Sequence, residues 1–174
     1  MKTSLAALLL ASSALAAGLP PAVTLVSAAC GSDDIHFDVK PAGRPAPQLE
    51  PGKALVFVVE DYETPKNELG RVTVRVGVDG AWIGADRGSS WLSFAASPGE
   101  HHLCVDWQSP HAAAGGPKVS LNRLDAEAGQ TYYFRARMTE HSLSLWTLDL
   151  DRVNSDEGQR LVGSFPLSDY RQKK

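Results

Sequence analysis

The chain repeats one pattern three times: a tight turn that contains glycine, followed directly by strand-forming residues. The turns are Pro51-Gly52-Lys53, Pro98-Gly99-Glu100 and Ala128-Gly129-Gln130. A fourth turn, at Asp79-Gly80, is the strongest short-range signal for a β-hairpin, because a type I′ turn needs positive φ at both central residues. Turns at this spacing favour a small all-β domain made of short strands.

Alternating hydrophobicity defines the strands between these turns. The clearest case is Val72–Val78, in which the valines point one way and Arg71, Thr73 and Arg75 point the other way. Ala54–Val59 is apolar on both sides, which indicates a central strand covered on both faces. The other strand candidates are Trp82–Gly84, Trp91–Ala96, His101–Trp107, Val119–Leu124, Thr131–Met138 and Leu143–Leu150.

Near the C-terminus the pattern changes to that of a helix. Asn154 and Glu157 are spaced as in a capping box, which predicts a short helix that ends near Val162, before Gly163 and Pro166. The fold class predicted from these elements is all-β. It is a single β-sandwich of about 7–8 antiparallel strands with a short C-terminal helix.

The N-terminus has the order of charged, apolar and small residues that is typical of a secretory signal. Lys2 is followed by the apolar run Leu5–Leu10 and then by small residues as far as Ala17. Pro20-Pro21 interrupts the apolar stretch, whereas a membrane-spanning helix needs roughly 20 apolar residues. The sequence therefore predicts a protein exported to the periplasm, the cell envelope or the medium. The predicted divisions are a signal peptide at 1–29, an extended lead-in at 30–51 and the β-sandwich domain at 52–170.

The lead-in is polar at its start and rich in proline further on. Ile35–Val39 is a candidate edge strand within it. Four prolines, Pro41, Pro45, Pro47 and Pro51, are expected to exclude regular pairing along the rest, because proline has no backbone N–H to donate to a ladder.

The net charge argues against a nucleic-acid partner. The chain carries 17 Lys and Arg against 20 Asp and Glu, a formal net charge of −3. Proteins that bind nucleic acid usually carry a concentrated basic patch. No nucleic-acid partner is predicted, and the partner expected for an exported module is an envelope protein or a glycan of unknown identity.

The two cysteines, Cys30 and Cys104, have two interpretations. In an exported domain such a pair is most simply a disulfide, which would close a loop of about 75 residues and contribute roughly 4 kcal/mol. The alternative is lipidation of Cys30, because bacterial lipoproteins are acylated at a cysteine that follows small residues. Val26–Ala29 fits that pattern poorly, since Leu is usual at the third position before the cysteine. A lipid at Cys30 would be the one predicted membrane contact.

The chain contains four short segments in fixed order: Gly52–Val56, Gly77–Ala85, Pro98–Cys104 and Ala126–Arg135. These segments include a hairpin of the form DG…G…PGEH. Together they resemble a family of exported bacterial β-domains of unknown function, often found in predicted lipoproteins. The resemblance covers roughly residues 50–150, and it implies a sandwich-like fold and an envelope address. It supplies no catalytic residues.

One cluster of potential metal ligands runs from His101 to Asp106, with His111 nearby. On a strand, His102, Cys104 and Asp106 share one face, and zinc accepts ligands two residues apart. A disulfide would remove Cys104 from such a site, so neither a metal nor another cofactor is predicted. His101 is expected to be a partly buried histidine with hydrogen-bond partners.

Candidate ligand-binding residues are two tryptophans and two arginines. Trp82 and Trp91 each follow a turn and are expected near a sheet end, where exposed rings can stack on sugar faces. Arg135 and Arg137 are expected on the polar face of a strand, where they could contact anions or aromatic rings.

The functional prediction is a non-enzymatic, exported binding or accessory module of unknown ligand, with no catalytic residues. One alternative is a glycan-binding module that uses Trp82 and Trp91. A second alternative is a metal-dependent enzyme that uses His102, Asp106 and His111. No Gly-x-Ser-x-Gly nucleophile motif or phosphate-binding glycine loop is present in the sequence.

Overall fold

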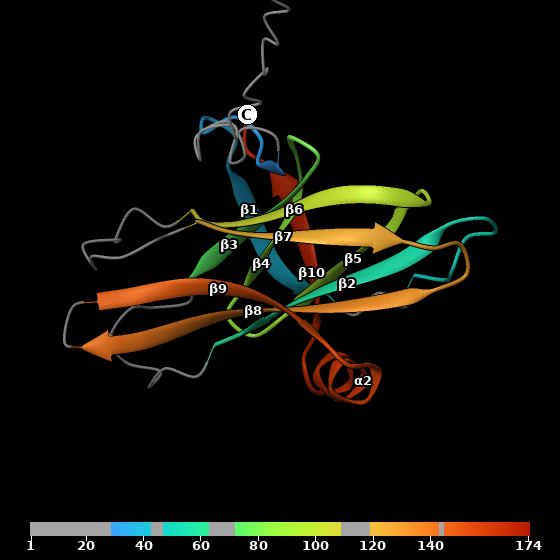
Figure 1. Ribbon diagram of the computed structural model, residues 1–174. Coiled ribbons are helices and arrows are strands. Elements are labelled where there is room, and N and C mark those ends of the chain that lie inside the picture. Colours follow the sequence, from blue (N-terminus) through green and yellow to red (C-terminus); the bar gives the residue numbers. More distant parts are fainter. Residues whose placement is uncertain (1–28, 43–46, 63–71, 109–118, 143–144) are drawn as a thin grey trace, which may run out of the picture.

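The computed structural model describes residues 29–42, 47–62, 72–108, 119–142 and 145–174. They form two β-sheets and one helix, which confirms an all-β sandwich (Figure 1). The six-stranded sheet has the order β1-β10-β5-β2-β8-β9, and the four-stranded sheet has the order β4-β3-β6-β7. The elements are β1 Phe37–Ala42, β2 Ala54–Asp61, β3 Thr73–Val78, β4 Ala81–Arg87, β5 Trp91–Ala96, β6 Gly99–Trp107, β7 Val119–Ala126, β8 Thr131–Ser142, β9 Leu145–Val153, α2 Ser155–Ser164 and β10 Leu167–Gln172.

The strand count and the strand directions differ from the prediction. The described chain has ten strands rather than about 7–8, and two of the pairs are parallel: β2 with β8 and β5 with β10. Parallel neighbours are joined by long connections, so no turn pattern in the sequence predicts that these strands pair. The strand β10 was missed because it follows the helix and carries mixed polar and apolar residues.

The main core lies between the two sheets. It contains the inward-facing valines of β2 and β3 together with Leu92, Leu103, Leu124 and Phe134. The predicted hairpin turn is confirmed, since Asp79 and Gly80 have φ angles of 51° and 83°. These positive angles are the backbone geometry that the Asp-Gly pair accommodates.

A second, smaller core lies on the outer face of the six-stranded sheet, where α2 packs (Figure 1). The helix begins at the predicted cap, where Asn154 Oδ1 accepts a hydrogen bond from the Glu157 N–H at 2.9 Å. Leu161 and Gly158 face the sheet, and Gly158 lies so close to Tyr133 that it leaves no room for a Cβ atom. Because sheet and helix cover both faces, every residue of β2 is buried, as its apolar sequence predicted.

Side chains bridge the margins of the two sheets. On one side Asn122 Nδ2 donates to the Leu150 carbonyl at 2.9 Å, and the Leu150 N–H donates to Ser120 Oγ at 3.0 Å, so that β7 is linked to β9. On the other side the Phe37 N–H donates to Gln108 Oε1 at 2.6 Å, and Gln108 Nε2 donates to the Phe37 carbonyl at 2.8 Å. The Gln108 amide thus pairs with the backbone at the start of β1 as a neighbouring strand would.

The strand β1 lies within the segment predicted as a lead-in, and it pairs with β10 along its whole length. Pro41 is part of this pairing, which an edge strand tolerates. The strand β10 then meets β5 at a single residue pair, Leu167 with Trp91. Beyond that pair β10 turns towards β4, where the Tyr170 ring packs on Gly84, and a Cβ atom at Gly84 would lie 2.6 Å from Tyr170 Cζ.

Candidate functional site

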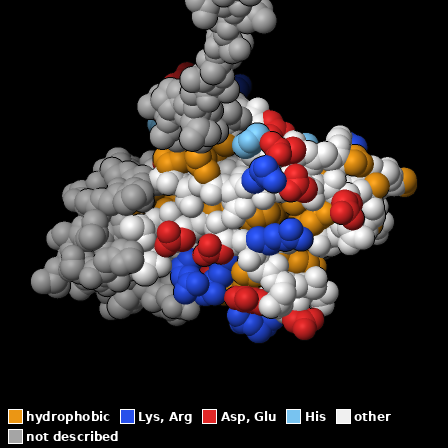
Figure 2. Space-filling view, viewed as in Figure 1, with side chains coloured by type: hydrophobic (Ala, Val, Ile, Leu, Met, Phe, Trp, Pro, Cys, Tyr) orange, Lys and Arg blue, Asp and Glu red, His pale blue; other side chains and the backbone are white. Residues whose placement is uncertain are grey.

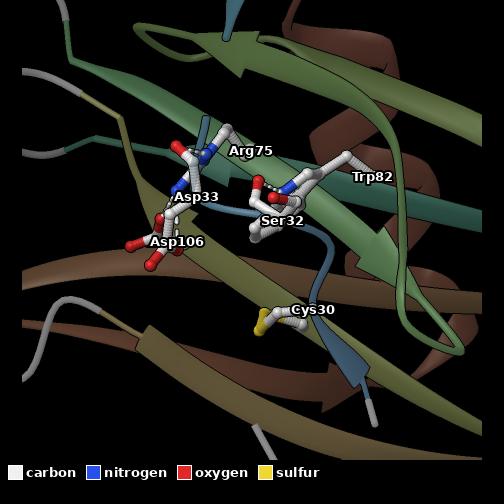
Figure 3. The surroundings of a disulfide bond; sticks show 7 residues. Cys30, Ser32, Asp33, Arg75, Trp82 and Asp106 are labelled. Atoms are coloured by element: carbon white, nitrogen blue, oxygen red, sulfur yellow. Dashed lines mark hydrogen bonds and ion pairs between the residues drawn. A yellow bond between two sulfur atoms is a disulfide. The ribbon is translucent and has the colours of Figure 1, made fainter. Parts of the chain in front are cut away.

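The N-terminal described residues are fastened to the four-stranded sheet by a disulfide (Figure 3). Cys30 and Cys104 are joined, with their Cα atoms 5.3 Å apart. Cys104 lies in β6 and is fully buried, and Ala29 packs beside it. The pairing inferred from the sequence is therefore present in the structure, and it pins the start of the lead-in to a central strand.

Trp82 holds the next residues of the same segment. Its Nε1 donates to the Ser32 carbonyl at 2.7 Å, and the Arg75 guanidinium lies over its ring at 4.3 Å from the centroid. Gly31 contacts the same ring so closely that a Cβ atom there would overlap it. One end of the lead-in thus packs on Trp82. The lead-in therefore covers part of the ring that the sequence suggested as a sugar-binding surface.

Arg75 makes the third contact that holds this segment. In the sequence it lies on the polar side of its strand, opposite the valines, where a solvent-exposed side chain would be usual. It is instead buried, with 4% of its surface exposed, because the lead-in covers that side of β3. Its Nη1 donates to the Ile35 carbonyl at 2.7 Å and to the Asp33 carbonyl at 3.2 Å. Its Nη2 forms an ion pair with Asp106 on the neighbouring strand β6 (Figure 3). Arg71 lies outside the described residues.

The prediction that Trp91 offers an exposed ring is wrong. Trp91 is 5% exposed, because it lies on the outer face of the sheet and helps to form the core beneath α2. Its ring meets Phe57 edge-on at 5.5 Å, and its Nε1 donates to the Phe165 carbonyl at 2.9 Å. A sugar cannot stack on this ring in the folded protein.

The two candidate arginines of β8 have internal partners or neighbours. Arg135 forms ion pairs with Asp61 at the end of β2 and with Glu157 in the first turn of α2, the latter at 3.1 Å. This network ties the helix to two strands. Arg137 is partly buried and lies opposite Asp149 in the pairing of β8 with β9.

The described part of the histidine cluster does not assemble as a metal site. His101 Nδ1 lies 2.6 Å from Asp79 Oδ2, and its Nε2 lies 2.8 Å from the Ser97 carbonyl oxygen. Burial opposes protonation, but these two hydrogen bonds outweigh it and raise the pKa of His101. Cys104 is in the disulfide and Asp106 is paired with Arg75. His111 lies outside the described residues, and within the described part no three His, Cys, Asp or Glu side chains converge on one point.

The most unusual polar groups were not singled out from the sequence. Glu60 on β2 and Asp86 on β4 are each 1% exposed. Glu60 Oε2 accepts a hydrogen bond from the Gly88 N–H at 2.9 Å, whereas Glu60 Oε1 and both Asp86 oxygens have no hydrogen-bond partner. Burial raises the pKa of Asp86 to about 8. Burial, followed by the nearby Asp86 carboxylate, raises the pKa of Glu60 well above its usual value.

Two surface depressions lined by described residues have room for a ligand group. One, of about 410 Å³, is lined by residues of β8 and by the segment from Arg152 to Ser155. The other, of about 330 Å³, lies between β5 and β10 and is lined by Leu92, Ser93 and the residues from Leu167 to Tyr170, with Pro47 at its side. Both are shallow and partly polar. On the face drawn in Figure 2, acidic and basic side chains lie next to one another.

Comparison of the chain with protein-family models, with curated proteins and with solved structures found no match in any of the three. No helix in the described part of the chain has the length and apolar character needed to cross a membrane.

Proposed function

We propose that this protein is an exported, non-enzymatic module that binds a partner protein of the cell envelope or the secreted fraction. The N-terminal order of charged, apolar and small residues, which is typical of a secretory signal, supports this address. A disulfide supports it as well, because disulfides persist in oxidising compartments such as the periplasm. Acylation of Cys30 would require a free thiol, so the disulfide argues for the untethered form of the module.

The observation that carries the proposed binding mode is the separation of β10 from β5. Beyond Leu167 and Trp91, no strand of the described chain pairs with that side of β5. The Trp91 N–H points to this side, since it donates to the Pro166 carbonyl at 3.1 Å. Backbone groups alternate along a strand, so the N–H and C=O groups of Ser93 and Ala95 point to the same side.

The occupant that fits this arrangement is an extended segment of the partner. Main-chain groups along a strand recognise another main chain, and pockets beside the strand accept alternate side chains. The depression between β5 and β10 lies beside this side of β5 and is lined by Ser93 and by the residues from Leu167 to Tyr170. An extended peptide with an apolar side chain beside Leu167 therefore matches this surface. The glycan-binding alternative is weaker, since Trp91 is buried and Trp82 is engaged by the lead-in.

Site-specific photo-crosslinking in the producing cells tests this proposal. A photo-reactive phenylalanine analogue at Ser93 should give a defined protein adduct, and the same analogue at exposed Asp125 on β7 is the control. Adding Ala95→Pro should lower the Ser93 adduct by about tenfold, because proline removes the N–H that strand addition needs. The thermal midpoint of Ala95→Pro shows whether the domain stays folded. Equal adducts at the two positions, or an adduct that survives Ala95→Pro in a folded protein, would rule the strand-addition site out.

A further inference from the structure

Glu60 and Asp86 face each other across the interior of the sandwich. Glu60 lies on the same side of β2 as Val56 and Val58, which belong to the core between the sheets. Asp86 lies opposite Val74 in the pairing of β3 with β4, and Val74 belongs to the same core. Each carboxylate therefore comes from a different sheet and points into the space between them.

Two hydroxyl groups lie beside these carboxylates. Ser90 and Ser168 are both buried, and Ser168 Oγ donates to Ser90 Oγ at 2.7 Å. The Gly88 N–H that binds Glu60 belongs to the turn that leads from Asp86 to Ser90. Ser168 lies near enough to Asp86 to oppose part of the rise in its pKa, although in the structure its hydroxyl points to Ser90. Oxygen atoms from β2, β4, β10 and this turn thus gather in one place.

The charge in this group of oxygens is not balanced within the described chain. No ion pair joins Glu60 or Asp86 to a described Lys, Arg or His side chain, and three of the four carboxylate oxygens have no partner. The attraction of Arg87 is the smallest of the influences on the pKa of Glu60. Buried carboxylates without a counter-charge are costly, and in proteins they are paired, protonated or bound to a metal. The pair therefore needs something that the described chain does not supply.

The geometry points to a structural Ca²⁺ site formed by Glu60 and Asp86, with the Ser90 and Ser168 hydroxyls as further oxygen ligands. Two carboxylates neutralise a divalent cation, and a set made of oxygen alone selects a hard one rather than zinc or copper. Ca²⁺ fits better than Mg²⁺, which dehydrates reluctantly and keeps several waters, because these side chains are almost completely shielded from solvent. The bound ion would join the two sheets at the 87–90 turn.

Protons compete with the cation for the same oxygens. Both carboxyl groups hold their protons to an unusually high pH when no cation is bound, because burial raises the pKa of each. Binding of Ca²⁺ therefore releases protons, and its affinity should increase as the pH rises from 6 towards 8. A pair that binds protons alone would show the same high pKa values and no response to Ca²⁺.

Thermal unfolding of the purified protein, first freed of metal with a chelator, tests this inference. At pH 8, 10 mM CaCl₂ should raise the midpoint by about 5 °C, on the affinity usual for extracellular calcium sites. MgCl₂ and NaCl at matched ionic strength should raise it much less, and the calcium shift should shrink at pH 6. Asp86→Asn should lose the shift, whereas Asp125→Asn, which removes an exposed carboxylate on β7, should keep it.

Terbium luminescence gives a second readout that does not depend on stability. Tb³⁺ replaces Ca²⁺ at oxygen sites, and Trp91, the next residue after Ser90, can sensitise its emission. One Tb³⁺ per chain, displaced by Ca²⁺, is the expected result. If Asp86→Asn does not fold, Ser168→Ala keeps both carboxylates and should weaken Tb³⁺ binding about tenfold. A calcium shift no larger than the magnesium shift, or Tb³⁺ binding unaffected by Ser168→Ala, would overturn the site.

Discussion

Replacing both cysteines by alanine is expected to lower the free energy of unfolding by roughly 4 kcal/mol, through the Cys30–Cys104 link. The sequence separation of 74 makes the closed loop long, so the cross-link removes much conformational freedom from the unfolded chain. The contacts of Ser32 with Trp82 and of Ile35 with Arg75 remain in the variant, but nothing covalent then holds the segment against the sheet. Denaturant unfolding of the wild-type protein and the variant measures the difference.

Reduction provides the matched control for this prediction. A reductant should destabilise the wild-type protein by the same amount and leave the alanine variant unchanged. A loss below about 1 kcal/mol would mean that the non-covalent contacts of Trp82 and Arg75 are sufficient to hold the lead-in in place.

The second large effect concerns pH. In the presence of a chelator, the free energy of unfolding should fall as the pH rises from 5 to 8, by roughly 1 kcal/mol per pH unit. In the unfolded chain Asp86 ionises near the ordinary aspartate pKa of 3.8, but in the folded chain burial raises its pKa to about 8. The unfolded state therefore binds fewer protons between these values, and stability is highest at the acidic end of this window and is lost towards pH 8. Glu60 acts in the same direction.

Variants distinguish the effect of Glu60 and Asp86 on the pH dependence of stability from the effect of the other titrating residues. His101 acts in the same direction. Burial lowers its pKa, but its hydrogen bonds to Asp79 and Ser97 outweigh this effect and raise the pKa in the folded state. Its contribution to stability is therefore lost as the pH rises above about 6.5. The double variant Glu60→Gln/Asp86→Asn should flatten the slope between pH 5 and pH 8 and should be more stable than the wild-type protein at pH 8. Asp125→Asn should retain the wild-type slope. A wild-type stability that is flat or rises across this range would contradict the assignment.

Much of the fold could be predicted from local patterns. The valines of β3 specify its register, the Asp79-Gly80 pair specifies the hairpin turn, and Asn154 specifies the start of α2. Each of these signals comes from residues within a few positions of one another. The apolar sequence of β2 also predicted correctly that both faces of this strand are covered.

The parts that could not be predicted depend on contacts between distant segments. Arg75 reads as a solvent-facing residue of an alternating strand, and it is buried because residues some forty positions earlier cover it. Trp91 reads as a residue at a turn, and it is buried because α2 packs over it. Glu60 and Asp86 look like ordinary strand-end acids until the two sheets bring them into the same interior. The Cys30–Cys104 pair was predicted correctly from a count of the cysteines alone. His101 was also predicted correctly as a partly buried histidine with hydrogen-bond partners, since it lies on an apolar side of a strand.

The central claim, an exported and untethered module fastened by a disulfide, is tested most directly by the intact mass of the protein from its native cells. The mass should be measured before and after reduction. The expected chain has lost its N-terminal signal, carries no lipid and gains the two hydrogens of a reduced disulfide. A chain that begins at Cys30 with a large mass excess, and that gains nothing on reduction, would contradict the claim and identify a lipoprotein with a free Cys104.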